Sequence, residues 1–213
     1  MNWRPLLILF LGLVPLRAQP ADPLFFTWHA FEYVAYEKTN REVTLQVHFR
    51  THSEFRQFAM LRGAVYGTQR LPKGWLWTTG YLRQTQEVVG DTEWARQQRV
   101  YSSLSRPMRQ GRLRHTPRVQ YDYLFDMAVA AYGRSRFSWQ TEWAGPVRPY
   151  AVAELFTETA GLQRFRPRVG VRFQAARRVE ADIVYQYDRI YLRGQTNRHI
   201  VQTTLTFRRR GKD

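Results

Sequence analysis

The feature that most constrains the fold is a two-residue alternation of polar and apolar side chains. In the segment 164–174 one parity is dominated by arginine, at Arg164, Arg166, Arg168 and Arg172. The residues between them are mostly apolar, such as Phe165, Val169 and Val171. Because successive side chains of a β-strand point to opposite faces, the segment predicts a strand with one cationic face and one apolar face.

The next segment, 179–188, repeats this alternation with acidic residues on the polar parity, among them Glu180, Asp182 and Asp188. Only residues 175–178 separate the two segments, which is short enough for a hairpin. An antiparallel pair would place the arginine row beside the acidic row on one face. Similar alternation recurs at 42–50, 112–123, 134–143 and 198–207, and more weakly at 25–36, 55–70, 75–88 and 94–106.

The connections between these segments alternate in length. Short ones fall at 38–40, 72–74, 110–111, 145–146 and 176–177, and longer ones near 52–54, 89–93, 126–133, 157–163 and 194–197. Short turns at one end, longer loops at the other and strands of about 9–11 residues or more are typical of an outer-membrane barrel. Together with the stretch between the connections at 145–146 and 157–163, these segments make eleven candidate strands, whereas bacterial single-chain barrels use even numbers. The sequence therefore predicts an all-β fold, an antiparallel up-and-down meander closed into a transmembrane β-barrel of about 10–12 strands.

The first 18 residues predict a cleaved signal peptide. Arg4 supplies the positive start, Leu6–Val14 an apolar stretch, and Ala18 a small residue before the expected cleavage. The apolar stretch is too short to cross about 30 Å of hydrocarbon as a helix. We therefore expect export, with residues 19–213 forming a single barrel domain located in the bacterial outer membrane.

Composition excludes several classes of function. The chain has no cysteine, which rules out disulfides, cysteine-ligated metals and thiol catalysis. Its net charge of +16 would suggest nucleic acid in a cytosolic protein, but here the arginines alternate within strands of an exported chain. No nucleic-acid partner, metal or cofactor is predicted. The sequence lacks HExxH, GxSxG and glycine-rich phosphate motifs, so no catalytic residue is assigned.

The chain resembles domain of unknown function family 2490 (DUF2490), a group of uncharacterised bacterial outer-membrane proteins. The resemblance covers about residues 24–208. Its most specific stretches are Glu154-Leu155-Phe156, the segment 164–171, Tyr185-Gln186-Tyr187 and the segment 197–202. It implies a barrel in the outer membrane and no known activity.

We expect the polar parity to face the barrel interior. The candidate lumen-lining residues are Arg112, Arg114, Arg118, Glu142, Glu154, Arg164, Arg166, Arg168, Arg172, Glu180 and Asp182. They could line a conduit for small anionic solutes or form a salt-bridged plug. A barrel of about 10–12 strands has a narrow lumen that long side chains can largely fill, which favours the plug. Arginine exceeds acid, which keeps the anion alternative open.

The predicted function is an exported outer-membrane barrel in contact with membrane lipids, with a structural or passive-transport role. One alternative is a periplasmic lipocalin-like binding barrel, with an apolar interior and a polar outside. A membrane-embedded lipid-modifying enzyme is a further one. Because a lipid-facing charge is costly, the membrane barrel predicts that arginine at Val171 or Ile183 blocks assembly and that arginine at Gln174 or Gln186 is mild.

Overall fold

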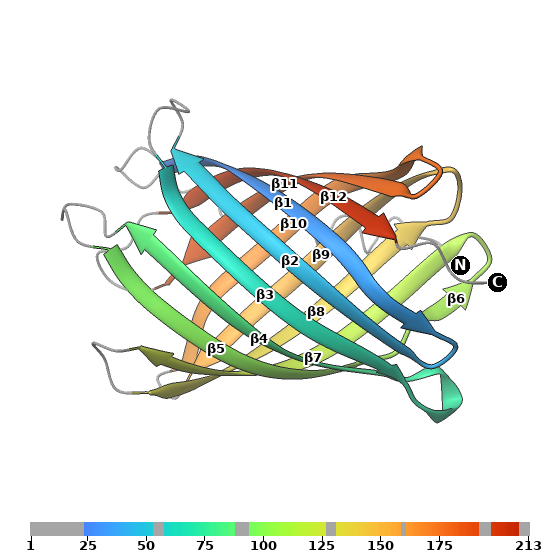
Figure 1. The fold of residues 1–213 in the computed structure, drawn as a ribbon, viewed down its shortest axis with the longest axis horizontal. Helices are drawn as coiled ribbons and strands as arrows, with labels where there is room; N and C mark the ends of the chain where they lie inside the picture. The colour runs from blue at the N-terminus through green and yellow to red at the C-terminus, as the bar shows by residue number, and fades with distance from the viewer. Residues whose placement is uncertain are drawn as a thin grey trace.

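The computed structural model describes residues 24–52, 58–87, 94–126, 131–158, 161–191 and 197–208. The predicted signal peptide, residues 1–18, lies outside the described residues. The described chain forms one closed β-barrel whose strands run obliquely around the axis (Figure 1). No helix among the described residues is long and apolar enough to cross a membrane.

Twelve strands are present in the described ranges, and eleven of them form the barrel wall. The strands are β1 (Leu24–Lys38), β2 (Arg41–His52), β3 (Phe58–Arg70), β4 (Leu76–Glu87), β5 (Trp94–Ser105), β6 (Met108–Gln110), β7 (Leu113–Asp126), β8 (Tyr132–Trp143), β9 (Val147–Glu158), β10 (Gly161–Ala176), β11 (Val179–Ile190) and β12 (Arg198–Arg208). The short β6 pairs with the start of β7, and a 3-10 turn, η1 (Pro72–Gly74), joins β3 to β4.

Each wall strand pairs antiparallel with the next wall strand along the chain, and β5 pairs with β7. The barrel closes where β1 and β12 pair in parallel, from Leu24 beside Arg198 to Val34 beside Arg208. A meander reverses direction at every turn, so with eleven strands the first and the last must run the same way. The closed barrel of 10–12 strands is thus confirmed, with one parallel seam in a wall that the sequence predicted to be antiparallel throughout.

All four weakly alternating segments form wall strands. The first of these runs as one strand through Lys38, with a register shift against β2 between Val34 and Tyr36. An extra residue at such a shift changes the face to which the following side chains point. The mixed faces of the segment arise mainly before this shift, because the inward positions Phe26, Ala30 and Val34 are apolar and buried.

The strand ends joined by the five short connections of the sequence lie at one end of the barrel, such as Lys38 and Arg41, and the opposite strand ends lie at the other (Figure 1). We call these the turn end and the loop end. The prediction of a longer loop at 157–163 is wrong, because β9 continues to Glu158 and β10 begins at Gly161, with Leu162 beside Thr157. The connection between β9 and β10 is therefore short although it lies at the loop end.

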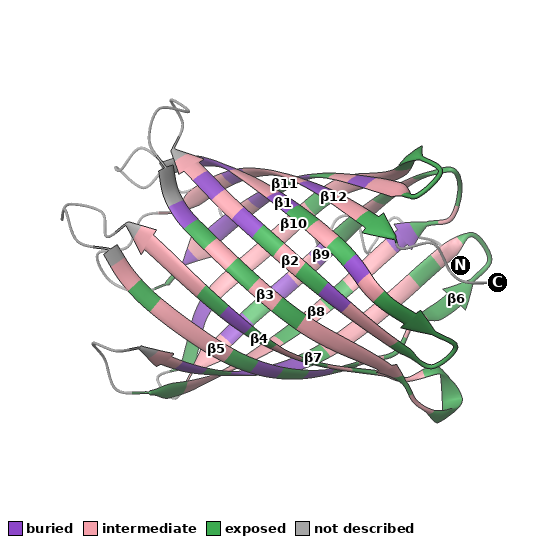
Figure 2. Ribbon diagram, in the orientation of Figure 1, coloured by how far each residue is buried: buried purple, intermediate pink, exposed green. Residues whose placement is uncertain are grey.

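The two faces of the wall differ sharply in chemistry. Outward side chains are mostly apolar and exposed, as at Val169 (56%) and Ile183 (45%), whereas many inward ones, such as Asp122 (0%) and Gln186 (1%), are polar and buried. Figure 2 shows this as alternating exposure along the strands. The polar parity of the sequence therefore faces the barrel interior.

Candidate functional site

A set of apolar side chains is buried in the barrel interior near the loop end. We call this set the apolar layer; each member is buried and lies near the loop end of its strand: Phe26, Met60, Leu124, Phe156, Ile190 and Ile200. Arginine side chains surround the ring of Phe156. The guanidinium carbons of Arg136 and Arg166 each lie 4.7 Å from the ring centroid. Guanidinium groups at this range are attracted to the face of an aromatic ring. The apolar layer is therefore in direct contact with arginines of the neighbouring ion-pair network.

Next to the apolar layer lies a continuous ion-pair network, which begins at Asp122 on β7. The Asp122 carboxylate is fully buried and accepts hydrogen bonds from Arg134 Nη2 at 2.9 Å and Arg136 Nη2 at 3.1 Å. Arg99 Nη1 lies 3.5 Å away, and the Gln120 amide donates to Oδ1 at 2.5 Å. One carboxylate thus faces three guanidinium groups.

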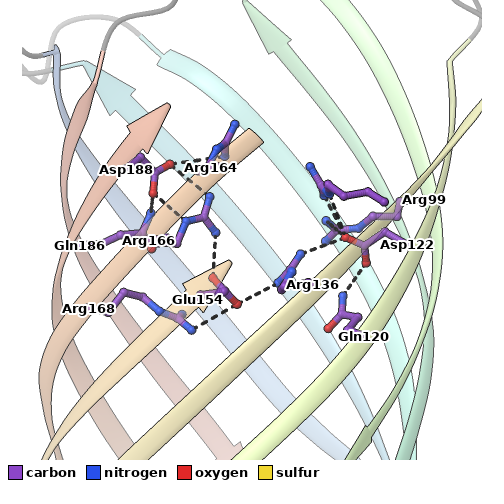
Figure 3. Close-up of polar contacts among 11 residues, drawn as sticks. Arg99, Gln120, Asp122, Arg136, Glu154, Arg164, Arg166, Arg168, Gln186 and Asp188 are labelled. Atoms are coloured by element: carbon purple, nitrogen blue, oxygen red, sulfur yellow. Dashed lines mark hydrogen bonds and ion pairs between the residues drawn. The ribbon is translucent and has the colours of Figure 1, made fainter. Parts of the chain in front are cut away.

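The network continues through Glu154 on β9 to Asp188 on β11. Arg136 reaches Glu154 at 3.4 Å, and Arg166 binds both Glu154 at 3.4 Å and Asp188 at 2.6 Å. Two further arginines pair with the same carboxylates: Arg168 with Glu154, and Arg164 with Asp188. Figure 3 shows these residues linked across the barrel interior. We call the set Arg99, Asp122, Arg134, Arg136, Glu154, Arg164, Arg166, Arg168 and Asp188 the central network.

Charge balance within the central network is unequal, since three carboxylates hold six arginines. Taking an ion out of water costs several kcal/mol unless partners compensate it, and a lost partner leaves an uncompensated buried charge. Each carboxylate is therefore shared by at least two guanidinium groups, and its loss would leave several cations facing one another.

A second group of ion pairs lies nearer the turn end. Arg172 on β10 contacts Glu142 at 3.0 Å, Asp182 at 3.0 Å and Glu180 at 3.6 Å. The Tyr150 hydroxyl donates to Asp182 at 2.8 Å. These contacts link strands β8 to β11 on the inner face of the barrel.

A cavity of about 550 Å³ lies in the interior and reaches the turn end, where Glu42, Glu180 and Arg208 line it. No member of the apolar layer lines it. Among the described residues, eight arginines and four acidic residues line the cavity, together with threonine and glutamine side chains. This cavity thus extends towards the turn end and does not reach the apolar layer.

The structure separates the predicted lumen-lining residues into three groups. The residues that line the cavity are Arg118, Arg166, Arg168, Arg172, Glu180 and Asp182. Glu142, Glu154 and Arg164 face the interior within the ion-pair groups. Arg112 lies in the turn between β6 and β7 and Arg114 near the turn end of β7, and both are exposed. The alternation of β7 continues into the part of the chain that the barrel no longer encloses. The polar parity alone therefore could not show that these two arginines lie outside the lumen.

Several members of the central network were absent from the candidate set. Asp122, Arg134 and Arg136 follow the polar parity of their segments, and that signal could have included them. Arg99 had no such signal, because it lies in a segment with mixed faces. Only the pairing of β5 with β7 brings it to Asp122.

Hydrogen bonding offers no support for the enzymatic alternative. His29, His48, His115 and His199 contact Thr203, Arg62, Thr141 and Tyr185 respectively, and in the described ranges no serine hydrogen-bonds to them. Nor do three or more acidic or histidine side chains gather as a metal site in the described part of the chain. No protein-family model matches the chain, and no curated protein matches it either.

Proposed function

We propose that this protein is an exported outer-membrane β-barrel with a structural role, its lumen obstructed near the loop end. The observation that carries the proposal is the orientation of the wall, with apolar side chains outside and ion pairs inside. A spanning barrel needs an apolar outer band against lipid and tolerates a polar interior. A lipocalin-like barrel needs the opposite arrangement, because it holds its ligand in an apolar interior and meets water outside.

Exposed aromatic side chains at both ends of the wall support the membrane location. Trp77 and Trp143 are exposed near the turn end, and Tyr123 and Tyr132 are exposed near the loop end. Such amphipathic rings are enriched at both membrane–water interfaces. By the usual orientation of these barrels, the turn end would face the periplasm.

The obstruction favours a structural role over passive transport. A solute crossing the barrel would have to pass the central network and the apolar layer, whose side chains meet around Phe156. Opening that path would separate buried ion pairs and cation–π contacts together. The resemblance to DUF2490 and the predicted signal peptide agree with this proposal.

Cell fractionation and planar-bilayer recordings test the two parts of the proposal. The protein should fractionate with outer-membrane vesicles and migrate differently on gels before and after heating. The purified barrel should show no steady conductance. Recovery in the periplasmic fraction without detergent would contradict the membrane location. Steady anion-selective current would instead support passive transport.

A further inference from the structure

Two of the eight cavity-lining arginines, Arg62 and Arg118, form no ion pair among the described residues, although Arg62 lies within electrostatic range of Glu32 and Arg118 within that of Glu154. Arg118 on β7 makes no hydrogen bond or ion pair in the described part of the chain, although it lines the cavity. Arg62 on β3 donates to the Gln46 side chain at 3.2 Å and also contacts His48 Nδ1, both uncharged or weakly basic groups. Within the described ranges, the other six cavity-lining arginines each reach a carboxylate.

Tyr101 on β5 also lines the cavity and interacts electrostatically with both arginines. Its ring stands over Gly80 of β4, where an added Cβ would lie 2.7 Å from both Tyr101 Cζ and Oη. Its Oη makes no hydrogen bond in the described part of the chain, and the side chain lies within electrostatic range of both Arg62 and Arg118. The absence of a side chain at Gly80 thus lets the phenol lie along the wall.

We propose that Arg62, Tyr101 and Arg118 bind the phosphate group of a small phosphate monoester that enters from the turn end. Two unpaired guanidinium groups match the double negative charge of such a phosphate, and the phenol adds a donor for one of its oxygens. A cavity of about 550 Å³ lies in the range of small-molecule sites. Its threonine and glutamine lining suits a hydroxyl-rich body rather than an acyl chain.

Nearby charges favour an anion at this place. Arg136, Arg166 and Arg168 also line the cavity, and their own carboxylates, Asp122, Glu154 and Asp188, do not. The acidic lining residues are Glu32, Glu42, Glu180 and Asp182. Of these, Glu180 and Asp182 pair with Arg172, and Glu42 pairs with Arg208. Glu32 accepts hydrogen bonds from Gln46 and Thr206 and lies within electrostatic range of Arg62. With eight arginines and four acidic residues lining the cavity, arginine remains in excess.

Isothermal titration of the purified barrel in phospholipid-free detergent tests the site, with inorganic phosphate and glycerol 3-phosphate as probes at low ionic strength. Arg118→Gln and Arg62→Gln should each weaken binding about tenfold or more, since a hydrogen bond to a charged group contributes about 1.5–3 kcal/mol. The control is Arg112→Gln, which removes the same charge from an exposed turn and should leave affinity within about twofold.

Arg118→Gln breaks no ion pair of the described residues. Glu154, with which Arg118 interacts electrostatically, keeps its ion pairs with Arg136, Arg166 and Arg168. Heat-modifiable gel migration of each variant checks that the barrel is intact. Absence of phosphate binding by the intact wild-type barrel, or equal affinity of Arg112→Gln and Arg118→Gln, would overturn the proposal. Tighter binding of dioctanoyl phosphatidic acid than of glycerol 3-phosphate would also overturn it, by assigning the site to a lipid. These outcomes do not depend on where the protein fractionates.

Discussion

At the scale of single residues, the interior depends on a few carboxylates that each hold several arginines. Asp122 is the clearest case, because three guanidinium groups and one amide converge on it in a fully buried position. An arginine lost from this cluster leaves two others, whereas the carboxylate has no substitute.

We expect Asp122→Asn to destabilise the barrel by about 3–5 kcal/mol, the cost of leaving buried charges without their partner. Urea unfolding in lipid vesicles measures the change. The control is Glu37→Gln, an equally conservative substitution whose carboxylate pairs with Arg208 at the exposed turn end and should contribute about 0–1 kcal/mol. Equal stability of the two variants would argue against the central network as a determinant of stability.

Gly170 on β10 is a second residue with a specific structural task. A Cβ there would lie 2.7 Å from Tyr150 Cζ and 2.9 Å from the Ile183 carbonyl oxygen. Gly170→Ala should therefore destabilise the barrel by about 1–3 kcal/mol, the usual cost of overpacking. Gly63→Ala is the matched control, because nothing lies within 4 Å of its added Cβ. The prediction is refuted by an unfolding midpoint that Gly170→Ala leaves unchanged.

At the scale of elements, each strand carries two environments that alternate residue by residue. Ile183 is exposed on the outer face near the middle of β11, beside Val171 of β10. Gln174 lies on the inner parity of β10 but at the turn end, where it is exposed. The same side-chain change should therefore have opposite consequences at the two positions.

Ile183→Arg should block or strongly reduce membrane assembly, because a charge facing lipid near the midplane costs about 2–4 kcal/mol. Gln174→Arg should assemble normally. Gln186→Arg, which the sequence predicted to be mild, should instead be harmful, because Gln186 is 1% exposed and donates to Asp188 at 3.0 Å. Insertion into vesicles, followed by gel mobility, gives the measurement. Equal insertion of the Ile183→Arg and Gln174→Arg variants would contradict the outward orientation of Ile183.

The alternation explains why most strands and faces were predictable from the sequence. It is a local property, since side-chain direction in a strand depends only on position along that strand. Prediction from this alternation failed where the surroundings of a residue do not follow from its position along the strand. Arg112 lies beyond the enclosed part of the wall, and Arg99 pairs with Asp122, which lies on another strand.

At the scale of the whole molecule, the defining feature is the parallel seam between β1 and β12. It follows from the odd number of wall strands, and its register places His29 beside Thr203 and Phe31 beside Leu205. Because the chain has no cysteine, introduced thiols can report this register without interference.

A barrel carrying both Phe31→Cys and Leu205→Cys should form an internal disulfide on mild oxidation, because paired neighbours lie within bridging distance. The control combines Phe31→Cys with Val201→Cys, which is paired instead with Thr27, and should remain reduced. Mobility on non-reducing gels distinguishes the two. Crosslinking of the control pair alone would indicate a different closure of the barrel.

The sequence by itself determined the all-β class, most strand segments and, where the alternation is clear, which side chains share a face, because these depend on a period of two along a local stretch of chain. Only the tertiary structure decided the parallel closure, the sharing of Asp122, Glu154 and Asp188 among arginines from different strands, and the two cavity arginines left without an ion pair. These features depend on strand count and on which strands lie next to one another, and in which register. Neither is encoded in the neighbourhood of any one residue.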